Sequence, residues 1–242
     1  MHRIQIDPAI LQRFPQYSLM VIYAYNLQNP TSQTWSTEIL RQAEAEQRLV
    51  FASQKPAEHP HIAAWRSVYA EFGLKPSKFL CSAEALLSRV VKGLELPTIN
   101  TLVDLYNAVS IKHIMPIGGE DWDCLEDNLI LRFADGIELF DTFKDGQPVV
   151  ENPLQGEVIW ADGNRVTCRA WNWRQGIRTR LTEKSVNAYF ILDHLAPYPL
   201  EHLQMAGNQL IEYLKQVAPN CRIETELFGA AEPKLFGAAE PI

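Results

Sequence analysis

The chain has 242 residues, of which 47% are hydrophobic and 21% are charged, and its formal net charge is -7. This composition is that of an ordinary globular protein whose core needs no disulfide or metal support. No apolar run reaches the ~18 residues of a membrane span, and the first residues lack the apolar stretch of a signal peptide. We therefore expect a cytoplasmic protein with no membrane partner. The acidic balance argues against coating of nucleic acid by charge alone, and no DNA partner is expected.

The N-terminal half predicts one strand followed by four helices. Residues 17–25 are rich in β-branched and aromatic side chains, which favours a strand buried on both faces. Amphipathic spacing, capping residues and terminal glycines predict helices over residues 34–51, 60–72, 82–92 and 98–111. On the last of these helices Asn100, Asp104 and Asn107 share one polar face. Two interpretations explain this pattern about equally well. In one the side chains face solvent or tie down neighbouring loops, and in the other they form the rim of a small-molecule pocket.

The C-terminal half is richer in predicted strands. Residues 128–133 and 137–140 suggest two strands joined at Asp135-Gly136, and two helices are predicted over 182–195 and 201–217. The clearest signal is the hairpin of residues 157–161 and 165–171, which flank Asp162-Gly163. Strict alternation along its second strand separates two sets of side chains. One set is Val166, Cys168 and Ala170, and the other is Arg165, Thr167, Arg169 and Trp171.

Residues 1–226 are predicted to form a single α+β domain, a mixed sheet with helices packed on its faces. The remaining residues, 227–242, contain a short duplication, because the segment 227–233 recurs at 235–241. Two short copies are too few for a solenoid, so a flexible tail is expected. The alternative is a docking peptide that inserts Phe228 or Phe236 into a groove of a partner.

No cofactor or metal is expected. The cysteines Cys81, Cys124, Cys168 and Cys221 are far apart and form no C-x-x-C pair, which favours buried single thiols over a zinc site. His59 and His61 have no further ligand at a known metal-site spacing. The sequence also lacks the phosphate-loop, dinucleotide-binding, metalloprotease and nucleophile-elbow motifs.

A glycine pair and a basic stretch are the local features that point to a site. Gly118-Gly119 lets a ligand approach the backbone, and the following Glu120 and Asp121 are suited to proton transfer or to positioning water, although a plain glycine turn is the alternative. Residues 163–181 carry five arginines, two tryptophans and no acid. Arginine suits phosphate and tryptophan suits an unpaired base, so this stretch predicts RNA contact. The predicted RNA-binding residues are Arg165, Arg169, Trp171, Trp173, Arg174 and Arg178. In the alternative, the arginines pair with the acidic segment 120–127 and the tryptophans are core.

Several blocks of the chain resemble a free-standing B3/B4-type domain, similar to the editing module of the phenylalanyl-tRNA synthetase beta subunit. The resemblance runs from about residue 60 to 195. Its clearest part is N-x-x-V-D-x-x-N at residues 100–107, followed by Pro116 and Asp121, and the pattern I-x-R-x-A-x-G-x-E at 130–138 supports it. Further matching blocks are Trp65-Arg66, 76–79, 84–86 and 89–93.

The resemblance implies an α+β fold and a pocket that takes the amino-acid moiety of an aminoacyl-tRNA. In the synthetase this module hydrolyses tRNA that carries tyrosine in place of phenylalanine. The implied pocket residues here are Asn100, Asp104, Asn107, Pro116, Gly118 and Gly119. The residues expected to position water are Asp121, Gln175 and Thr179.

This chain departs from the synthetase module at two points. It has Gly118 where the module has a histidine, and Trp173-Arg174-Gln175 where the module has a loop that ends in glutamate. Nothing in the sequence suggests ATP-dependent aminoacylation. Three hypotheses remain open: a trans-acting deacylase for misacylated tRNA, a binding module for RNA or a small molecule without the chemistry, and a protein-interaction domain that uses the tail. The site assignment requires Gly118 and Gln175 to line one cavity.

Overall fold

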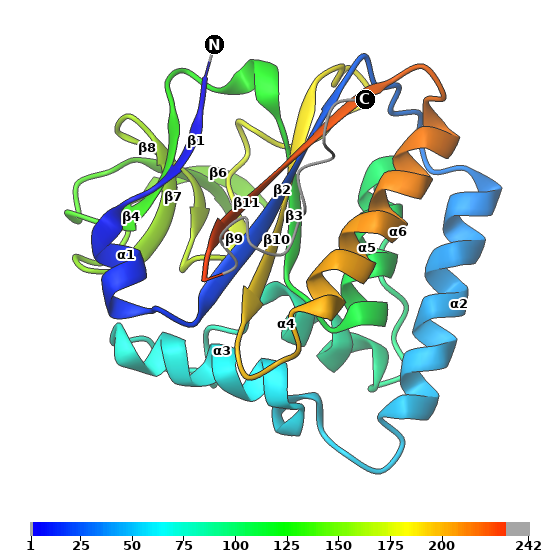
Figure 1. Cartoon of the computed structure of the whole chain (residues 1–242), viewed down its shortest axis with the longest axis horizontal. Helices are drawn as coiled ribbons and strands as arrows, with labels where there is room; N and C mark the ends of the chain where they lie inside the picture. Colours follow the sequence, from blue (N-terminus) through cyan, green and yellow to red (C-terminus); the bar gives the residue numbers. More distant parts are fainter. Residues whose placement is uncertain (1, 231–242) are drawn as a thin grey trace, which may run out of the picture.

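A computed structural model describes residues 2–230 as an α+β fold built on two β-sheets (Figure 1). The four-stranded sheet is antiparallel throughout and has the order β11-β2-β10-β3. Its strands are Arg222–Gly229 (β11), Tyr17–Tyr25 (β2), Ala188–Leu195 (β10) and Ile117–Asp121 (β3). The expected α+β fold with a mixed sheet is confirmed, because the second sheet contains both kinds of pairing.

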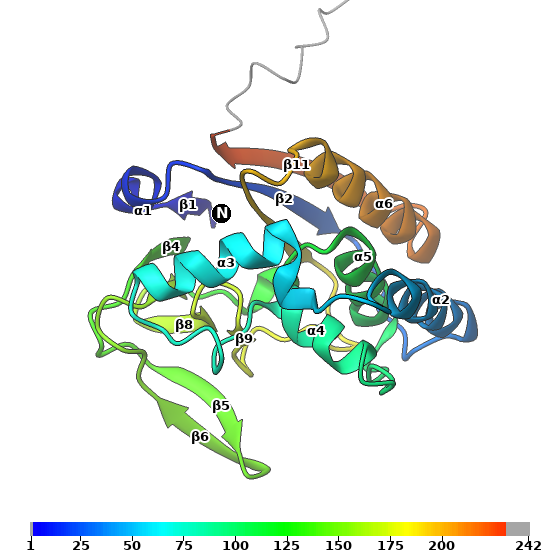
Figure 2. The same cartoon turned by 90° about the horizontal axis from the view of Figure 1, so that it is seen from below.

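The five-stranded sheet has the order β1-β4-β7-β8-β9, with β1 parallel to β4 and the other pairs antiparallel. Its strands are Ile4–Ile6 (β1), Leu129–Phe133 (β4), Val158–Asp162 (β7), Arg165–Arg169 (β8) and Arg174–Gln175 (β9). A separate hairpin is formed by Phe140–Lys144 (β5) and Gln147–Glu151 (β6). Figure 2 shows this hairpin projecting from the body on the side away from β11.

Six α-helices surround the sheets. They are Pro8–Arg13 (α1), Thr34–Val50 (α2), Pro60–Glu71 (α3), Ser82–Val90 (α4), Thr101–His113 (α5) and Glu201–Val217 (α6), and two 3-10 turns span Pro56–Glu58 and Trp122–Cys124. Helices α5 and α6 lie side by side next to the four-stranded sheet, with α2 outside α5 (Figure 1). No helix in the described part of the chain is long and apolar enough to cross a membrane.

The hydrophobic core has two halves, one on each face of the four-stranded sheet, and strand β2 contributes to both. Its odd-numbered residues from Tyr17 to Tyr23 pack toward the five-stranded sheet and α3, and Met20, Ile22 and Ala24 pack toward α5 and α6. Successive side chains of a strand point to opposite faces, so a strand covered on both sides is apolar throughout. The predicted strand at 17–25, buried on both faces, is confirmed.

The predicted helix at 182–195 is wrong, because residues 188–195 form β10 at the centre of the four-stranded sheet. Tyr189 and Ile191 face one half of the core, while Phe190 and Leu192 face the other. This is a period of two, which a helix cannot produce. The strand predicted at 137–140 is also displaced, since β5 begins at Phe140.

The predicted hairpin at 157–171 is confirmed as β7 and β8. Its turn is one residue later than expected, at Gly163-Asn164 instead of Asp162-Gly163, because Asp162 pairs with Arg165 as the last residue of β7. The strict alternation expected along β8 is wrong. Trp160 pairs with Cys168 and the next residue, Ala161, pairs with Val166, so Thr167 is an extra residue in a β-bulge. A bulge shifts the side-chain alternation by one residue. Thr167 and Cys168 therefore both line the same cavity.

The boundary expected at residue 226 is wrong, because β11 continues to Gly229 and pairs with β2. The first copy of the repeat thus begins inside the sheet. Phe228 packs against the chain's own core, which contradicts its expected role as a docking residue. Phe236 and the second copy lie outside the described residues.

Candidate functional site

A cavity of about 420 Å³ lies between the two sheets and helices α4 and α5. Strands β3 and β10 form one wall, and β7, β8, β9 and the segment between β8 and β9 form the other. Its volume falls in the range of small-molecule sites in proteins, roughly 300–1,000 Å³. The predicted site residues that line it are Asn107, Gly118, Trp171, Trp173, Arg174 and Gln175.

Gly118 and Gln175 lie next to each other in the lining of this cavity, so the structure meets the condition set by the sequence. The side-chain Nε2 of Gln175 donates a hydrogen bond to the backbone oxygen of Gly119 at 3.2 Å. The neighbouring glycine points the other way: a Cβ atom on Gly119 would lie 2.7 Å from the buried ring of Phe190. Gly118 thus opens the cavity, and Gly119 lets β3 pack on β10. Gly119 does not line the cavity itself.

Asn100, Asp104 and Pro116 do not line the cavity. The side chain of Asn100 caps α5 by accepting from the Val103 N–H at 3.0 Å, and it donates to the Leu181 carbonyl. Asp104 is buried and accepts from the Ile99 N–H at 3.1 Å. These side chains fix loops that surround the start of the helix, so the expectation that they contact a ligand is wrong. Of the shared polar face, Asn107 alone reaches the cavity.

Asp121 and Thr179 also lie outside the cavity lining. Asp121 accepts from the Asp123 N–H at 3.0 Å and from the Ser185 hydroxyl, and its own N–H donates to the Thr179 carbonyl. Each of these bonds ties β3 to the loops around it. The expected role of Asp121 and Thr179 in holding a catalytic water is therefore wrong, and Gln175 is the member of that trio that reaches the cavity.

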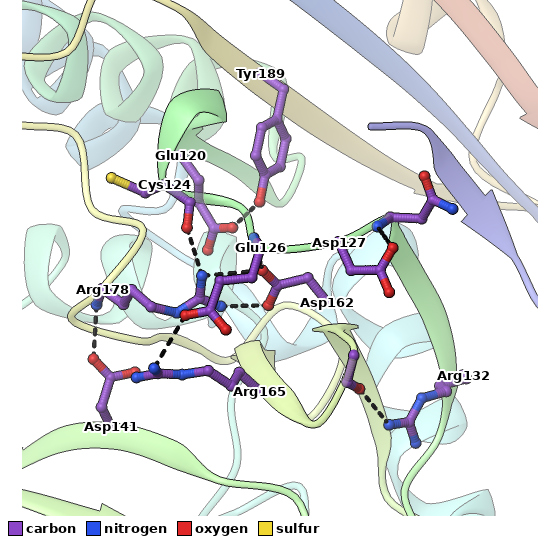
Figure 3. A network of polar contacts seen from close by, with 12 residues as sticks. Glu120, Cys124, Glu126, Asp127, Arg132, Asp141, Asp162, Arg165, Arg178 and Tyr189 are labelled. Carbon is purple, nitrogen blue, oxygen red and sulfur yellow. Dashed lines mark hydrogen bonds and ion pairs between the residues drawn. The ribbon is translucent and has the colours of Figure 1, made fainter. Parts of the chain in front are cut away.

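Two of the predicted RNA-binding arginines are paired with acids on the side of the molecule drawn in Figure 3. Arg165 contacts Glu126 at 3.1 Å, and Arg178 forms a two-pronged ion pair with Asp162 while donating to the Cys124 carbonyl. Asp162 holds the pKa of Arg178 above its usual value. Arg165 therefore pairs with the acidic segment 120–127, as the alternative predicts, whereas the acid that pairs with Arg178 is Asp162, outside that segment.

Arg169 and Trp171 are inside the protein. The guanidinium of Arg169 donates to both oxygens of Glu157, at 2.9 and 2.7 Å, and contacts Glu151 at 3.2 Å. Trp171 is 0% exposed, and its ring packs edge-on against Phe14 and Tyr17. Neither side chain is accessible to RNA, so that expectation is wrong for both.

Arg174 and Trp173 are the members of the set that remain accessible at the cavity. Arg174 is exposed, and its guanidinium lies 4.4 Å from the ring centroid of Trp173. Trp173 in turn packs edge-on against Phe79. Within residues 2–230 Arg174 has no ion-pair partner. A cation stacked on an aromatic ring beside a cavity mouth suits a phosphate or a base.

Two buried carboxyl groups also line the cavity. Glu120 accepts from the hydroxyl of Tyr189, and burial raises the pKa of Glu120 to about 7. Asp193 accepts from the Tyr17 hydroxyl and from Asn172 Nδ2 at 3.0 Å, and burial raises its pKa to about 7 as well. Sequence reasoning singled out Glu120 but missed Asp193, because a helix was predicted there. Alternation of Tyr189, Ile191 and Asp193 was the available signal.

An α+β protein with a ligand cavity between two sheets is the class that this fold and site define. The model of the B3/4 domain family matches residues 64–219, so the chain belongs to that family. Among solved structures it is similar to an N-terminal fragment of the phenylalanyl-tRNA synthetase beta subunit from Pyrococcus horikoshii, with 10% identity and a TM-score of 0.45. That match covers 91% of this chain and 50% of the fragment, so the chain spans half of its length. A search of curated proteins finds no match.

Proposed function

We propose that the protein binds the aminoacyl end of a charged tRNA in this cavity and hydrolyses the ester that joins amino acid and tRNA. The observation that carries the proposal is the meeting of Gly118, Gln175 and Asn107 in one cavity of about 420 Å³. Membership of the B3/4 domain family supports the proposal.

The reaction needs no protein nucleophile. A water molecule adds to the ester carbonyl carbon, the bond from that carbon to the ribose oxygen breaks, and a proton from the water ends on the ribose oxygen. The products are a free amino acid and an uncharged tRNA. Holding water and ester together in a closed site removes most of the entropic barrier to such a step.

Gln175 is the residue best placed to hold the water. Its Nε2 donates a hydrogen bond to the Gly119 carbonyl, and this bond fixes the plane of the amide. The amide oxygen is then left to accept a hydrogen bond from a water in the cavity. Gly118 provides the space in front of it, because any side chain at this position would meet the Gln175 amide. The ester is then placed beside Gly118, at the partly exposed end of the cavity.

The mouth of the cavity suits the end of an RNA. Arg174 and Arg89 are both exposed and both line the cavity, and Trp173 offers an aromatic face next to Arg174. Phosphate pairs with guanidinium, and an unpaired base stacks on an aromatic ring. Arg174 and Trp173 thus replace the longer set of six residues predicted from the sequence.

A second candidate function is binding of the same aminoacyl end without hydrolysis. The observation that favours it is the absence of a side chain at Gly118, where the similar synthetase module carries a histidine. In this reading Gln175 hydrogen-bonds the ligand instead of a water.

Incubation with a panel of mischarged tRNAs tests the proposal and separates the two functions. We expect amino-acid release from at least one member of the panel, and Gln175→Ala slows this release about 10- to 100-fold. The matched control is Gln216→Ala, an exposed glutamine on α6. Release at the spontaneous rate from every tRNA overturns hydrolysis, and a salt-dependent gel shift in the same samples then supports binding alone.

A further inference from the structure

The inner end of the cavity is the part of its lining around the buried carboxyl group of Glu120. Glu120 is 3% exposed, and its Oε2 accepts from Tyr189, but its Oε1 is buried without a partner among the described residues. The hydroxyl of Thr167, which is 1% exposed, lies beside this carboxyl group, and like the indole N–H of Trp171 it is buried without a geometrically well-formed hydrogen bond among the described residues. A buried polar atom left unpaired costs on the order of 1–3 kcal/mol, more for a charged group. A ligand that brings a donor to Glu120 removes this cost.

The charges of the cavity are separated along its depth. The two acids that line it, Glu120 and Asp193, are both buried, whereas its two cationic lining residues, Arg89 and Arg174, are both exposed at the rim. Strand pairing places Glu120 opposite Tyr189, four residues before Asp193, so the two carboxyl groups lie at different points of the wall. The lining has no lysine or histidine to pair with Glu120, and a buried carboxylate of this kind favours a cation as ligand.

Aromatic side chains form much of the cavity lining. Tyr106, Trp160, Trp171 and Tyr189 line the cavity and are buried. The faces of such rings attract an ammonium group, and aromatic walls combined with a counter-charge are a known way to bind one. Ile117 and Ile191 line the cavity as well and offer apolar contact to a methylene chain.

We propose that the inner end of this cavity binds an alkylammonium group, with Glu120 as its counter-ion and hydrogen-bond acceptor. This rests on the proposed function for one step only: if the ester lies at Gly118, the accepted amino acid carries the ammonium on its side chain. Gly118 and Glu120 are two residues apart on one face of β3, about 6.6 Å at ~3.3 Å per residue. A side chain that starts at Gly118 and runs along β3 therefore leads toward Glu120, as the side chain of lysine or ornithine would.

Calorimetric titration of the full chain with three amino-acid amides tests the proposal. All three have acetylated α-amines, so the side chain alone differs: Nα-acetyl-lysinamide, Nα-acetyl-norleucinamide and Nα-acetyl-tyrosinamide. We expect the lysine compound to bind at least about tenfold more tightly than the other two, because it alone places a cation on Glu120. Equal or tighter binding of the norleucine or tyrosine compound, or no binding of the lysine compound, overturns the proposal.

The variant Glu120→Gln adds a site-specific check. It is expected to weaken the lysine compound about tenfold and to leave the norleucine compound unchanged, which shows that the cavity is intact. Glu126→Gln, an acid-to-amide change at an exposed ion pair, is the matched control. Unchanged lysine binding in Glu120→Gln contradicts the assignment. If that variant does not fold, the three compounds on the unaltered chain still decide the question.

These titrations use no tRNA, so they fail independently of the proposed function. Binding of the lysine compound without release from any charged tRNA refutes the deacylase and keeps the ammonium site. Release from a tRNA without a preference for the lysine compound keeps the deacylase and refutes the ammonium site.

Discussion

Gly118 and Gln175 occupy adjoining space so closely that a Cβ atom on Gly118 would lie 2.9 Å from Nε2 of Gln175. No unstrained structure has a side chain at 118 and the present Gln175 conformation together. These are the two positions at which the chain departs from the synthetase module that it resembles, and the geometry makes the two departures interdependent.

The two neighbouring glycines should therefore respond differently to the same substitution. Gly119→Ala drives a methyl group into the buried ring of Phe190 and should lower the free energy of unfolding by about 1–3 kcal/mol. Gly118→Ala displaces only the flexible end of Gln175 and should cost less than about 1 kcal/mol. Urea unfolding of both variants measures the difference. Equal losses would contradict the assignment of Gly118 to the cavity and Gly119 to the core.

Glu120 should make the protein less stable as the pH rises. Burial raises its pKa from 4.5 to about 7. Between these two values the folded protein keeps a proton that the unfolded chain has released, so stability falls with increasing pH. Glu120→Gln removes this effect and should exceed the wild type by about 1–3 kcal/mol at pH 8, with a smaller difference at pH 5. Urea unfolding at both pH values measures it, and a difference independent of pH would refute the prediction.

His61 should remain neutral far into the acid range. Its Nε2 accepts hydrogen bonds from Trp65 and from the Leu195 N–H, which leaves the proton on Nδ1 to be donated to the Ile114 carbonyl. Burial lowers the pKa of His61 to about 3. Below about pH 6.5 the imidazole of His61 binds a proton in the unfolded chain but stays neutral in the folded protein. The free energy of unfolding therefore decreases as the pH falls from 6.5 toward 3.

The measurement for His61 is an NMR titration of its imidazole resonance, assigned by comparison with His61→Gln. We expect no titration between pH 8 and 5. A midpoint near 6.5 would mean that the ring is accessible and would contradict the hydrogen-bond arrangement described above.

Substitution of Arg169 should lower the stability of the protein, whereas substitution of Arg174 should weaken only its binding of tRNA. Arg169→Ala leaves the buried carboxylate of Glu157 unpaired and should cost about 3–5 kcal/mol of unfolding free energy. Arg174→Ala should leave the unfolding midpoint unchanged and weaken tRNA binding in a salt-dependent gel shift. Arg222→Ala, an exposed arginine on β11, is the control for loss of charge. Equal tRNA binding by the Arg174 and Arg222 variants would remove the proposed RNA contact.

Much of the secondary structure is predictable because its signals are local. Helices α2 and α3 and the hairpin of β7 and β8 follow from periodicity, proline and glycine positions and turn residues. Strand β10 was mistaken for a helix because it is buried on both faces: every residue from Ala188 to Leu195 is buried, so no polar residue alternates with the apolar ones on an exposed face. The period of two is present only as an alternation between two core faces, Tyr189 and Ile191 on one and Phe190 and Leu192 on the other, and it does not show as an apolar–polar pattern.

The site was predictable only in part. Gly118 and Gln175 were found from the glycine pair and the family resemblance. Arg169 and Trp171 were misassigned because their burial depends on partners that composition does not reveal, such as Glu157 on the approach to β7. Asp193 lines the cavity because it belongs to β10, and Thr167 lines it because of the bulge in β8. Both placements follow from how the strands pair, which the sequence alone does not show.

The pairing of β2 has a consequence for the order in which the molecule assembles. This strand is completed by residue 25, yet both of its partners, β10 and β11, come from residues 188–229. During synthesis this apolar strand remains unpaired until residues 188–229 have left the ribosome. Such long-range closure slows folding and exposes the strand to aggregation. The protein should therefore depend on chaperones more than its size suggests, and its cavity, which β10 lines, forms among the last of its features.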